Sequence, residues 1–181
     1  MEITLPGDWL VLTQQSSEGD PAFTELGLDY RQTMKRFEKM GIYLAATALN
    51  SGFEMNLLLG KDVRTFDYNL YSDEALQTIV DATVAQTAQD QENRNIVYTE
   101  GSVYQHAQAK FMVLDGYRSD LDAYVRQYGT VINGLAVSLV FGRYNGQTID
   151  EGALQQIQTI VDSISFAEMC IRDSLWRRTP G

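Results

Sequence analysis

The segment YGTVINGLAVSLVF, residues 128–141, constrains the fold more than any other part of the sequence. Two apolar runs flank Asn133-Gly134, a dipeptide that readily adopts the positive φ angles of a two-residue hairpin turn. The second run is mostly apolar at both sets of alternating positions, as is typical of a central strand with cover on both sides. Its two faces hold Leu135, Val137, Leu139 and Phe141, and Ala136, Ser138 and Val140, respectively.

Other strands are expected to follow one another through short turns. Alternating or apolar runs predict strands over residues 2–5, 9–13, 42–49, 53–60, 95–104, 109–118, 124–132 and 135–144. Consecutive hairpins, in place of repeated strand–helix–strand units, are typical of an antiparallel sheet with added helices. The predicted fold class is therefore α+β.

Helices are predicted where capping residues precede amphipathic runs. The expected N-terminal caps are Asp20, Asp29, Ser72 and Thr148, the last in a capping box with Glu151. Gly41 is placed to end the second helix, because glycine readily adopts the left-handed conformation at that position. The longest helix, after Ser72, should bury one stripe made of Leu76, Ile79, Val80 and Val84.

The charge of the chain excludes some classes of partner. Its 181 residues carry a formal net charge of −10, which opposes binding to nucleic acid and to anionic lipid surfaces, since both need clustered Lys and Arg. No apolar run approaches the ~20 residues that cross a bilayer. The start, MEITLPGDW, also lacks the features of a signal peptide. Because Met1 directly precedes a predicted strand, we expect that a preceding segment is missing.

The last residues differ from the rest of the chain. EMCIRDSLWRRTPG contains the only cysteine, Cys170, and three arginines. The codons GAG ATG TGT ATA AGA GAC AGC encode Glu168 to Ser174, and this string resembles the transposase mosaic end used to prepare sequencing libraries. We therefore predict one domain over residues 1–167 and a non-native segment over 168–181.

Several sequence segments along the chain together resemble those of the PsbP-like superfamily. They are ITLPGDW, FDYNLYSDEAL, VYQHAQAKFMVLDG, YGTVINGLAVSLVF and IQTIVDSISF. The resemblance covers residues 2–166 and depends on the order of the elements, not on a catalytic signature. It implies an α/β/α sandwich, with an antiparallel sheet of about six strands flanked by helices on both faces. It also implies a non-enzymatic role in binding or assembly at a membrane complex, with the envelope lipoproteins of Gram-positive bacteria as the most similar branch.

Catalytic groups are scarce in the sequence. His106 is the single histidine, so any triad or histidine metal site would have to include it. It lies in a predicted turn, where a structural role is expected. A small hydrolase that uses His106 with nearby aspartates is retained as an alternative. Asp115, Asp120 and Asp122 are weak metal candidates, because their spacing departs from that of a calcium-binding EF-hand loop.

Tyrosines are the strongest candidates for residues that bind a ligand or partner. Six fall in the second half of the predicted sheet: Tyr98, Tyr104, Tyr117, Tyr124, Tyr128 and Tyr144. If several share an exposed face, they would form an amphipathic surface for a sugar, a peptide or a protein. Tyrosine is also common at half-buried strand positions, so a purely structural role is the competing interpretation.

The sequence thus predicts a non-catalytic binding or assembly module without a cofactor. We expect it to act outside the cytoplasm, tethered through the missing N-terminal segment, with a protein partner at a membrane or envelope. A cytoplasmic protein-interaction domain is the second alternative.

Overall fold

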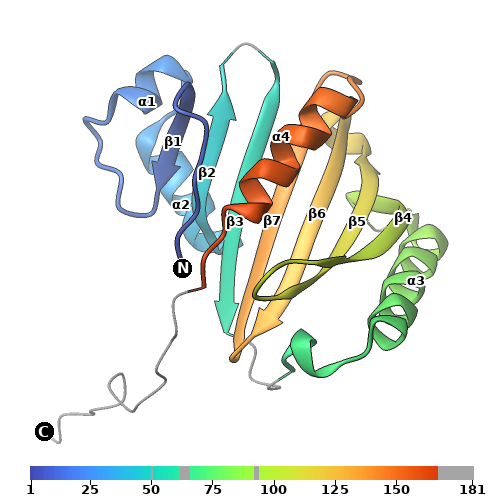
Figure 1. Cartoon of the computed structure of the whole chain (residues 1–181). Coiled ribbons are helices and arrows are strands. Elements are labelled where there is room, and N and C mark those ends of the chain that lie inside the picture. Colours follow the sequence, from blue (N-terminus) through green and yellow to red (C-terminus); the bar gives the residue numbers. More distant parts are fainter. Residues whose placement is uncertain (50, 62–65, 92–93, 167–181) are drawn as a thin grey trace, which may run out of the picture.

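The computed structural model describes residues 1–49, 51–61, 66–91 and 94–166. Seven strands form one antiparallel sheet in the order β1-β2-β3-β7-β6-β5-β4 (Figure 1). The strands are β1 Trp9–Thr13, β2 Ile42–Ala48, β3 Phe53–Lys61, β4 Ile96–Gln105, β5 Lys110–Arg118, β6 Ala123–Ile132 and β7 Leu135–Arg143. The α+β class is confirmed, with one strand more than the resemblance implied. The predicted non-native segment 168–181 lies outside the described residues.

The predicted opening strand over residues 2–5 does not form. Only Glu2 pairs there, through an isolated antiparallel bridge to Ser165. The amide of Glu2 donates to the carbonyl of Ser165 at 2.8 Å, and the reverse bond measures 3.0 Å. The N-terminal segment therefore lies beside the residues that follow the last helix (Figure 1).

Within the described residues, four α-helices and two short 3-10 helices accompany the sheet. They are α1 Pro21–Glu25, α2 Tyr30–Met40, η1 Tyr68–Leu70, α3 Asp73–Gln89, η3 Ser119–Leu121 and α4 Glu151–Asp162. None of the helices within the described ranges is long and apolar enough to cross a bilayer.

Most of the predicted helix ends are confirmed. Asp20, Asp29 and Ser72 cap α1, α2 and α3, and Gly41 ends α2 with a φ of 68°. The prediction for α4 was wrong, since its cap is Asp150 and not Thr148. The Asp150 carboxylate directly precedes the first helical residue and accepts the amide of Ala153 at 2.9 Å.

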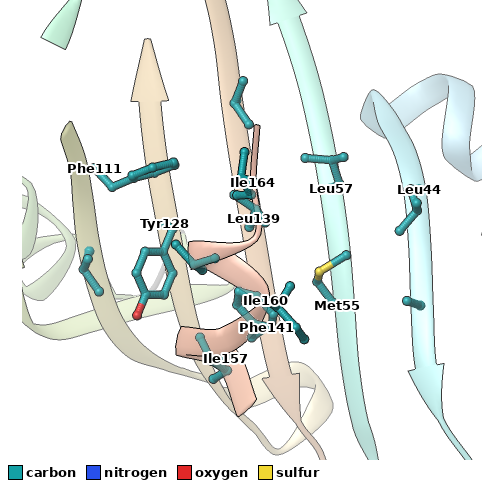
Figure 2. Close-up of a cluster of buried hydrophobic side chains, with 14 of the residues drawn as sticks. Leu44, Met55, Leu57, Phe111, Tyr128, Leu139, Phe141, Ile157, Ile160 and Ile164 are labelled. Carbon is teal, nitrogen blue, oxygen red and sulfur yellow. The ribbon is translucent and has the colours of Figure 1, made fainter. Parts of the chain in front are cut away.

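One face of the sheet is sealed by α4, which crosses its centre diagonally (Figure 1). A row of directly paired residues on this face runs from β2 to β5 and consists of Leu44, Leu57, Leu139, Tyr128 and Val113. Ile157, Ile160 and Val161 of α4 pack against this face in the main hydrophobic core (Figure 2). We call it the sealed face.

The opposite face carries α2 and α3 at its two margins. Phe37 of α2 packs with Leu12 and Ile42 over β1 and β2. At the other margin, Val80 of α3 lies against Gly101 of β4 and Leu114 of β5. Helices thus flank both faces of the sheet, as predicted.

Between α2 and α3 the centre of this second face stays open. Ala136, Ser138 and Val140 of β7 are only half-buried, whereas the alternate residues Val137, Leu139 and Phe141 are buried. The expectation that β7 has cover on both sides was therefore wrong for this face, because neither helix reaches the middle of the sheet. We call it the open face.

The apolar stripe predicted for α3 is only partly buried. Leu76 and Val80 are fully buried, but Ile79 is 43% exposed. Because the helix contacts only the β4–β5 margin, its contact with the sheet is narrower than the apolar pattern suggested.

Close packing of α3 on the sheet depends on a glycine. A Cβ atom at Gly101 would collide with Cγ1 of Val80 and lie 2.9 Å from the carbonyl oxygen of Val113. We expect Gly101→Ala to lower the free energy of unfolding by about 1–3 kcal/mol, the usual cost of overpacking. Urea denaturation measures this change.

The matched control is Gly129→Ala on β6, where an added Cβ meets no heavy atom within 4 Å. This variant should stay within about 0.5 kcal/mol of the wild type. Equal losses of stability in the two variants would contradict the described packing of α3.

Candidate functional site

A trough on the open face is the candidate site. It is a cavity of about 250 Å³ above the central strands β3, β7 and β6, with Arg36 and Met40 of α2 along one side. Its floor includes Leu58, Val125, Gln127, Ser138, Val140 and Gly142. The trough is therefore lined mainly by apolar groups, with a few polar side chains among them.

The alternation of side chains along the strands produces this hollow. On β7, the bulky residues Leu139 and Phe141 point to the sealed face, while Ser138 and Gly142 point to the open face. Because side chains alternate with a period of two, short side chains at every second position leave space on one face only. The short side chains of the floor are thus a local feature of β7, whereas one wall comes from Arg36 and Met40 of α2, far away in the sequence.

Hydrogen-bonding side chains cross the floor. The hydroxyl of Tyr98 donates to Oε1 of Gln127, and Nε2 of Gln127 donates to Oγ of Ser138 at 3.0 Å. Burial raises the pKa of Tyr98, which favours the neutral phenol. Gln127 and Ser138 therefore give the floor two linked, uncharged polar groups, and Tyr98, which does not itself line the trough, holds Gln127 in place.

One end of the trough is more polar. The hydroxyl of Tyr144 donates to Oε2 of Glu54 at 2.9 Å. Burial, and then the nearby Glu54 carboxylate, raise the pKa of Tyr144 to about 12, while Arg36 and Arg118 act in the opposite direction. Arg118 itself donates two hydrogen bonds to Asp120, at 2.8 and 3.0 Å.

The described ionisable residues that line the trough are Arg36, Arg118 and Tyr144. Among the described residues that line the trough, none is aspartate, glutamate, histidine or cysteine. Tyr144, with a pKa of about 12, holds its proton near neutral pH and can only donate or accept a hydrogen bond there.

The six predicted tyrosines do not share one face. Tyr104, Tyr117, Tyr124 and Tyr128 lie on the same side of the sheet as α4, whereas Tyr98 and Tyr144 lie on the open face. The six candidate tyrosines are thus divided between the two faces of the sheet, four on one face and two on the other. A register shift between Tyr98 and Glu100 contributes to the division, because it changes which β4 residues point to each face.

Two of these tyrosines have structural contacts on the sealed face. Tyr128 is 3% exposed and packs edge-on against Phe111 and Phe141. The hydroxyl of Tyr104 donates to Asp162 at the end of α4, and burial followed by this hydrogen bond raises the pKa of Tyr104 to about 12.

The hydrolase arrangement does not form. His106 lies at the β4–β5 turn, where Nδ1 accepts the amide of Gln108 at 3.2 Å and the ring contacts Phe111 and Phe166. Asp115 lies within β5 and is paired with Arg126, and Asp120 and Asp122 lie beyond the far end of β5. Nine extended residues separate His106 from Asp120 and Asp122 by roughly 25 Å, far outside hydrogen-bond reach.

The three candidate aspartates each have a different protein partner. Asp115 pairs with Arg126, Asp120 with Arg118, and Asp122 accepts the hydroxyl of Tyr117 at 2.5 Å. Over the described part of the chain, no three potential ligands gather as a metal site would require.

Sequence reasoning missed the trough residues. Asn56, Gln127 and Ser138 are isolated polar residues within apolar strands, and all three line the trough. They lie on the adjacent strands β3, β7 and β6, and their side chains point to the same face of the sheet. This shared orientation is the signal that could have indicated a polar floor.

Comparison with known proteins defines the fold class. Neither a protein-family model nor a curated protein matches the sequence. The fold is similar to the solution structure of cyanobacterial PsbP (CyanoP) from Synechocystis sp. PCC 6803. The TM-score is 0.50 and the identity 8%, over 87% of this chain and 81% of that chain. The chain therefore has a PsbP-like α+β fold, as the resemblance of the sequence predicted.

The phenol of Tyr144 gives a test of the trough's polar end. Its pKa is raised above the ordinary value of about 10, so the folded state favours the neutral phenol. The stability that Tyr144 contributes in this way should be lost as pH rises from 10 to 12. We expect Tyr144→Phe to lose less stability than the wild type across this window, as measured by urea unfolding at each pH.

Glu54→Gln serves as the companion variant, since it removes the carboxylate that opposes ionisation of Tyr144. Tyr144 should then titrate at a lower pH than in the wild type. If the alkaline loss of stability is the same in the wild type and Tyr144→Phe, the described environment of this phenol is incorrect.

Proposed function

We propose that this chain is a non-catalytic binding and assembly module, and that the trough receives an aromatic anchor side chain of a protein partner. The PsbP-like fold supports a non-catalytic role. The observation that carries the proposal is the half-buried row of Ser138 and Val140 at the centre of the open face, which lines the hollow beside Arg36 and Met40 of α2.

The chemistry of the trough favours an aromatic occupant. Its walls and floor are mainly apolar, through residues such as Met40, Leu58 and Val140. Gln127 and Ser138 add hydrogen-bonding groups at the floor. Tyr and Trp combine a large apolar ring with one polar group, and such side chains dominate the binding energy of many interfaces when they fill a pocket.

The volume of the trough agrees with one anchor side chain or two adjacent ones. At about 250 Å³, it lies below the ~300–1,000 Å³ typical of pockets for drug-sized ligands. The surrounding surface of α2 and α3 would then form the rim of the interface, where exposed residues such as Met40 and Ile79 contribute apolar area.

We place this module outside the cytoplasm, tethered to a membrane through a preceding segment, as the resemblance of the sequence implies. Sequencing the intact gene upstream of the Met1 codon tests the location. A lipid-attachment motif or a membrane-spanning segment upstream supports a location outside the cytoplasm. A reading frame that encodes neither favours the alternative of a cytoplasmic interaction domain.

Filling the trough tests the binding site. We expect N-acetyltryptophanamide, used as a minimal anchor, to shift the NMR methyl signals of Leu58, Val125 and Val140 in a saturable manner. Ser138→Leu should weaken this binding at least about tenfold, which corresponds to ~1.4 kcal/mol, because the added side chain occupies the floor.

Ser102→Leu is the matched control, since it makes the same change on β4 at an exposed position outside the trough. It should bind like the wild type. Binding that is unaffected by Ser138→Leu, or methyl shifts confined to the sealed face, would contradict the assignment of the trough.

A further inference from the structure

A second hollow lies on the same side of the sheet as α4, where β4, β5 and β6 approach the start of that helix. It has a volume of about 270 Å³, and its residues include Glu100, Asp115, Tyr117, Tyr124, Arg126 and Thr148. We call it the tyrosine pocket. It opens on the opposite face from the trough and is independent of the function proposed for the trough.

Two aromatic rings form one side of the tyrosine pocket. Tyr117 and Tyr124 are directly paired on β5 and β6, with ring centroids 5.2 Å apart and ring planes at 60°. Tyr124 is 38% exposed. The hydroxyl of Tyr117 is held by Asp122 at 2.5 Å, so its ring is fixed before any ligand arrives.

A row of charged groups lies beside the rings. Glu100, Asp115 and Arg126 are directly paired across β4, β5 and β6. Arg126 donates from Nε and from an Nη atom to the two carboxylate oxygens of Asp115, each at 2.6 Å. This bidentate pair is about three-quarters buried on both sides, so two planar polar groups are held rigidly at the pocket floor.

The row retains hydrogen-bonding capacity. A carboxylate accepts about four hydrogen bonds and a guanidinium donates five. The bonds between Arg126 and Asp115 use two of each, and Arg126 also hydrogen-bonds Tyr128. The bond to Asp115, and more weakly the charge of Glu100, raise the pKa of Arg126, which keeps it cationic. Acceptors and donors therefore stand side by side, next to aromatic faces.

This mixture of charges selects the kind of ligand. Glu100 and Asp115 against Arg126 give the row a net charge of −1, which disfavours an anion. A neutral ligand with adjacent hydroxyl groups can instead accept from Arg126 and donate to Asp115. Its apolar C–H face can pack on the ring of Tyr124.

We propose that the tyrosine pocket binds a neutral saccharide. A pyranose ring has an apolar C–H face and a rim of hydroxyl groups that both donate and accept. The volume of about 270 Å³ is just below the range for drug-sized ligands. The occupant is therefore a single sugar or the terminal sugar of a longer glycan.

Saturation-transfer NMR tests this proposal with a panel of neutral hexoses and N-acetylhexosamines, and with tetramethylammonium and inorganic phosphate as charged probes. We expect transfer to at least one sugar. Tyr124→Ala should weaken binding at least about tenfold, because it removes the exposed ring. Asp115→Asn should also weaken binding, since it removes a hydrogen-bond acceptor while keeping the side chain's shape.

Tyr43→Ala is the matched control, because Tyr43 is 41% exposed on β2 and does not line the pocket. It should leave sugar binding unchanged, and Ser138→Leu in the trough should do so too. The proposal is overturned if no sugar in the panel receives transfer, if only a charged probe binds, or if Tyr124→Ala and Tyr43→Ala have equal effects. Thermal unfolding of each variant confirms that it is folded.

Discussion

The packing of α4 against the central strands is the interaction on which the rest of the structure depends. Ile157, Ile160 and Val161 lie against a layer of large side chains that includes Leu139 and Phe141, all of them nearly or fully buried. Each such side chain contributes on the order of 1.5–3 kcal/mol when removed from water. This contact fixes β3, β7 and β6 at the centre of the sheet and commits one face to the core.

The opposite face has no comparable cover, and this asymmetry is what gives the molecule a candidate site. The helices α2 and α3 each pack on one margin, through Phe37 and Val80, and leave the middle of the sheet half-buried between them. A stable sealed face allows the open face to carry short and polar side chains such as Ser138 and Gln127. Covering that surface with a partner's aromatic side chain would gain apolar contacts that the chain cannot make alone.

Features that depend on neighbouring residues could be predicted from the sequence. The Asn133-Gly134 hairpin, the caps at Asp20, Asp29 and Ser72, and the α+β class all follow from short-range rules. The cap of α4 was missed by two residues, because Thr148 and Asp150 are both good caps and only the structure shows where the first turn begins.

Features that depend on distant elements could not be predicted in the same way. The apolar residues on both faces of β7 indicated full cover, but the distance between α2 and α3 decides whether cover exists, and no local pattern encodes that distance. The tyrosines divided between two faces for a similar reason, since a shift in register between Tyr98 and Glu100 is not visible in the alternation of residues. The trough and the tyrosine pocket are therefore products of tertiary structure.

The central claim is that the sheet has one sealed and one open face, and adjacent residues of β7 test it most directly. Methyl NMR with a soluble nitroxide measures how closely solvent approaches each side chain. We expect strong relaxation of the methyl signals of Val140 and Leu58, and little for those of Leu139 and Ile160. Equal protection of Val140 and Leu139 would mean that the second face is also covered, and would contradict the account.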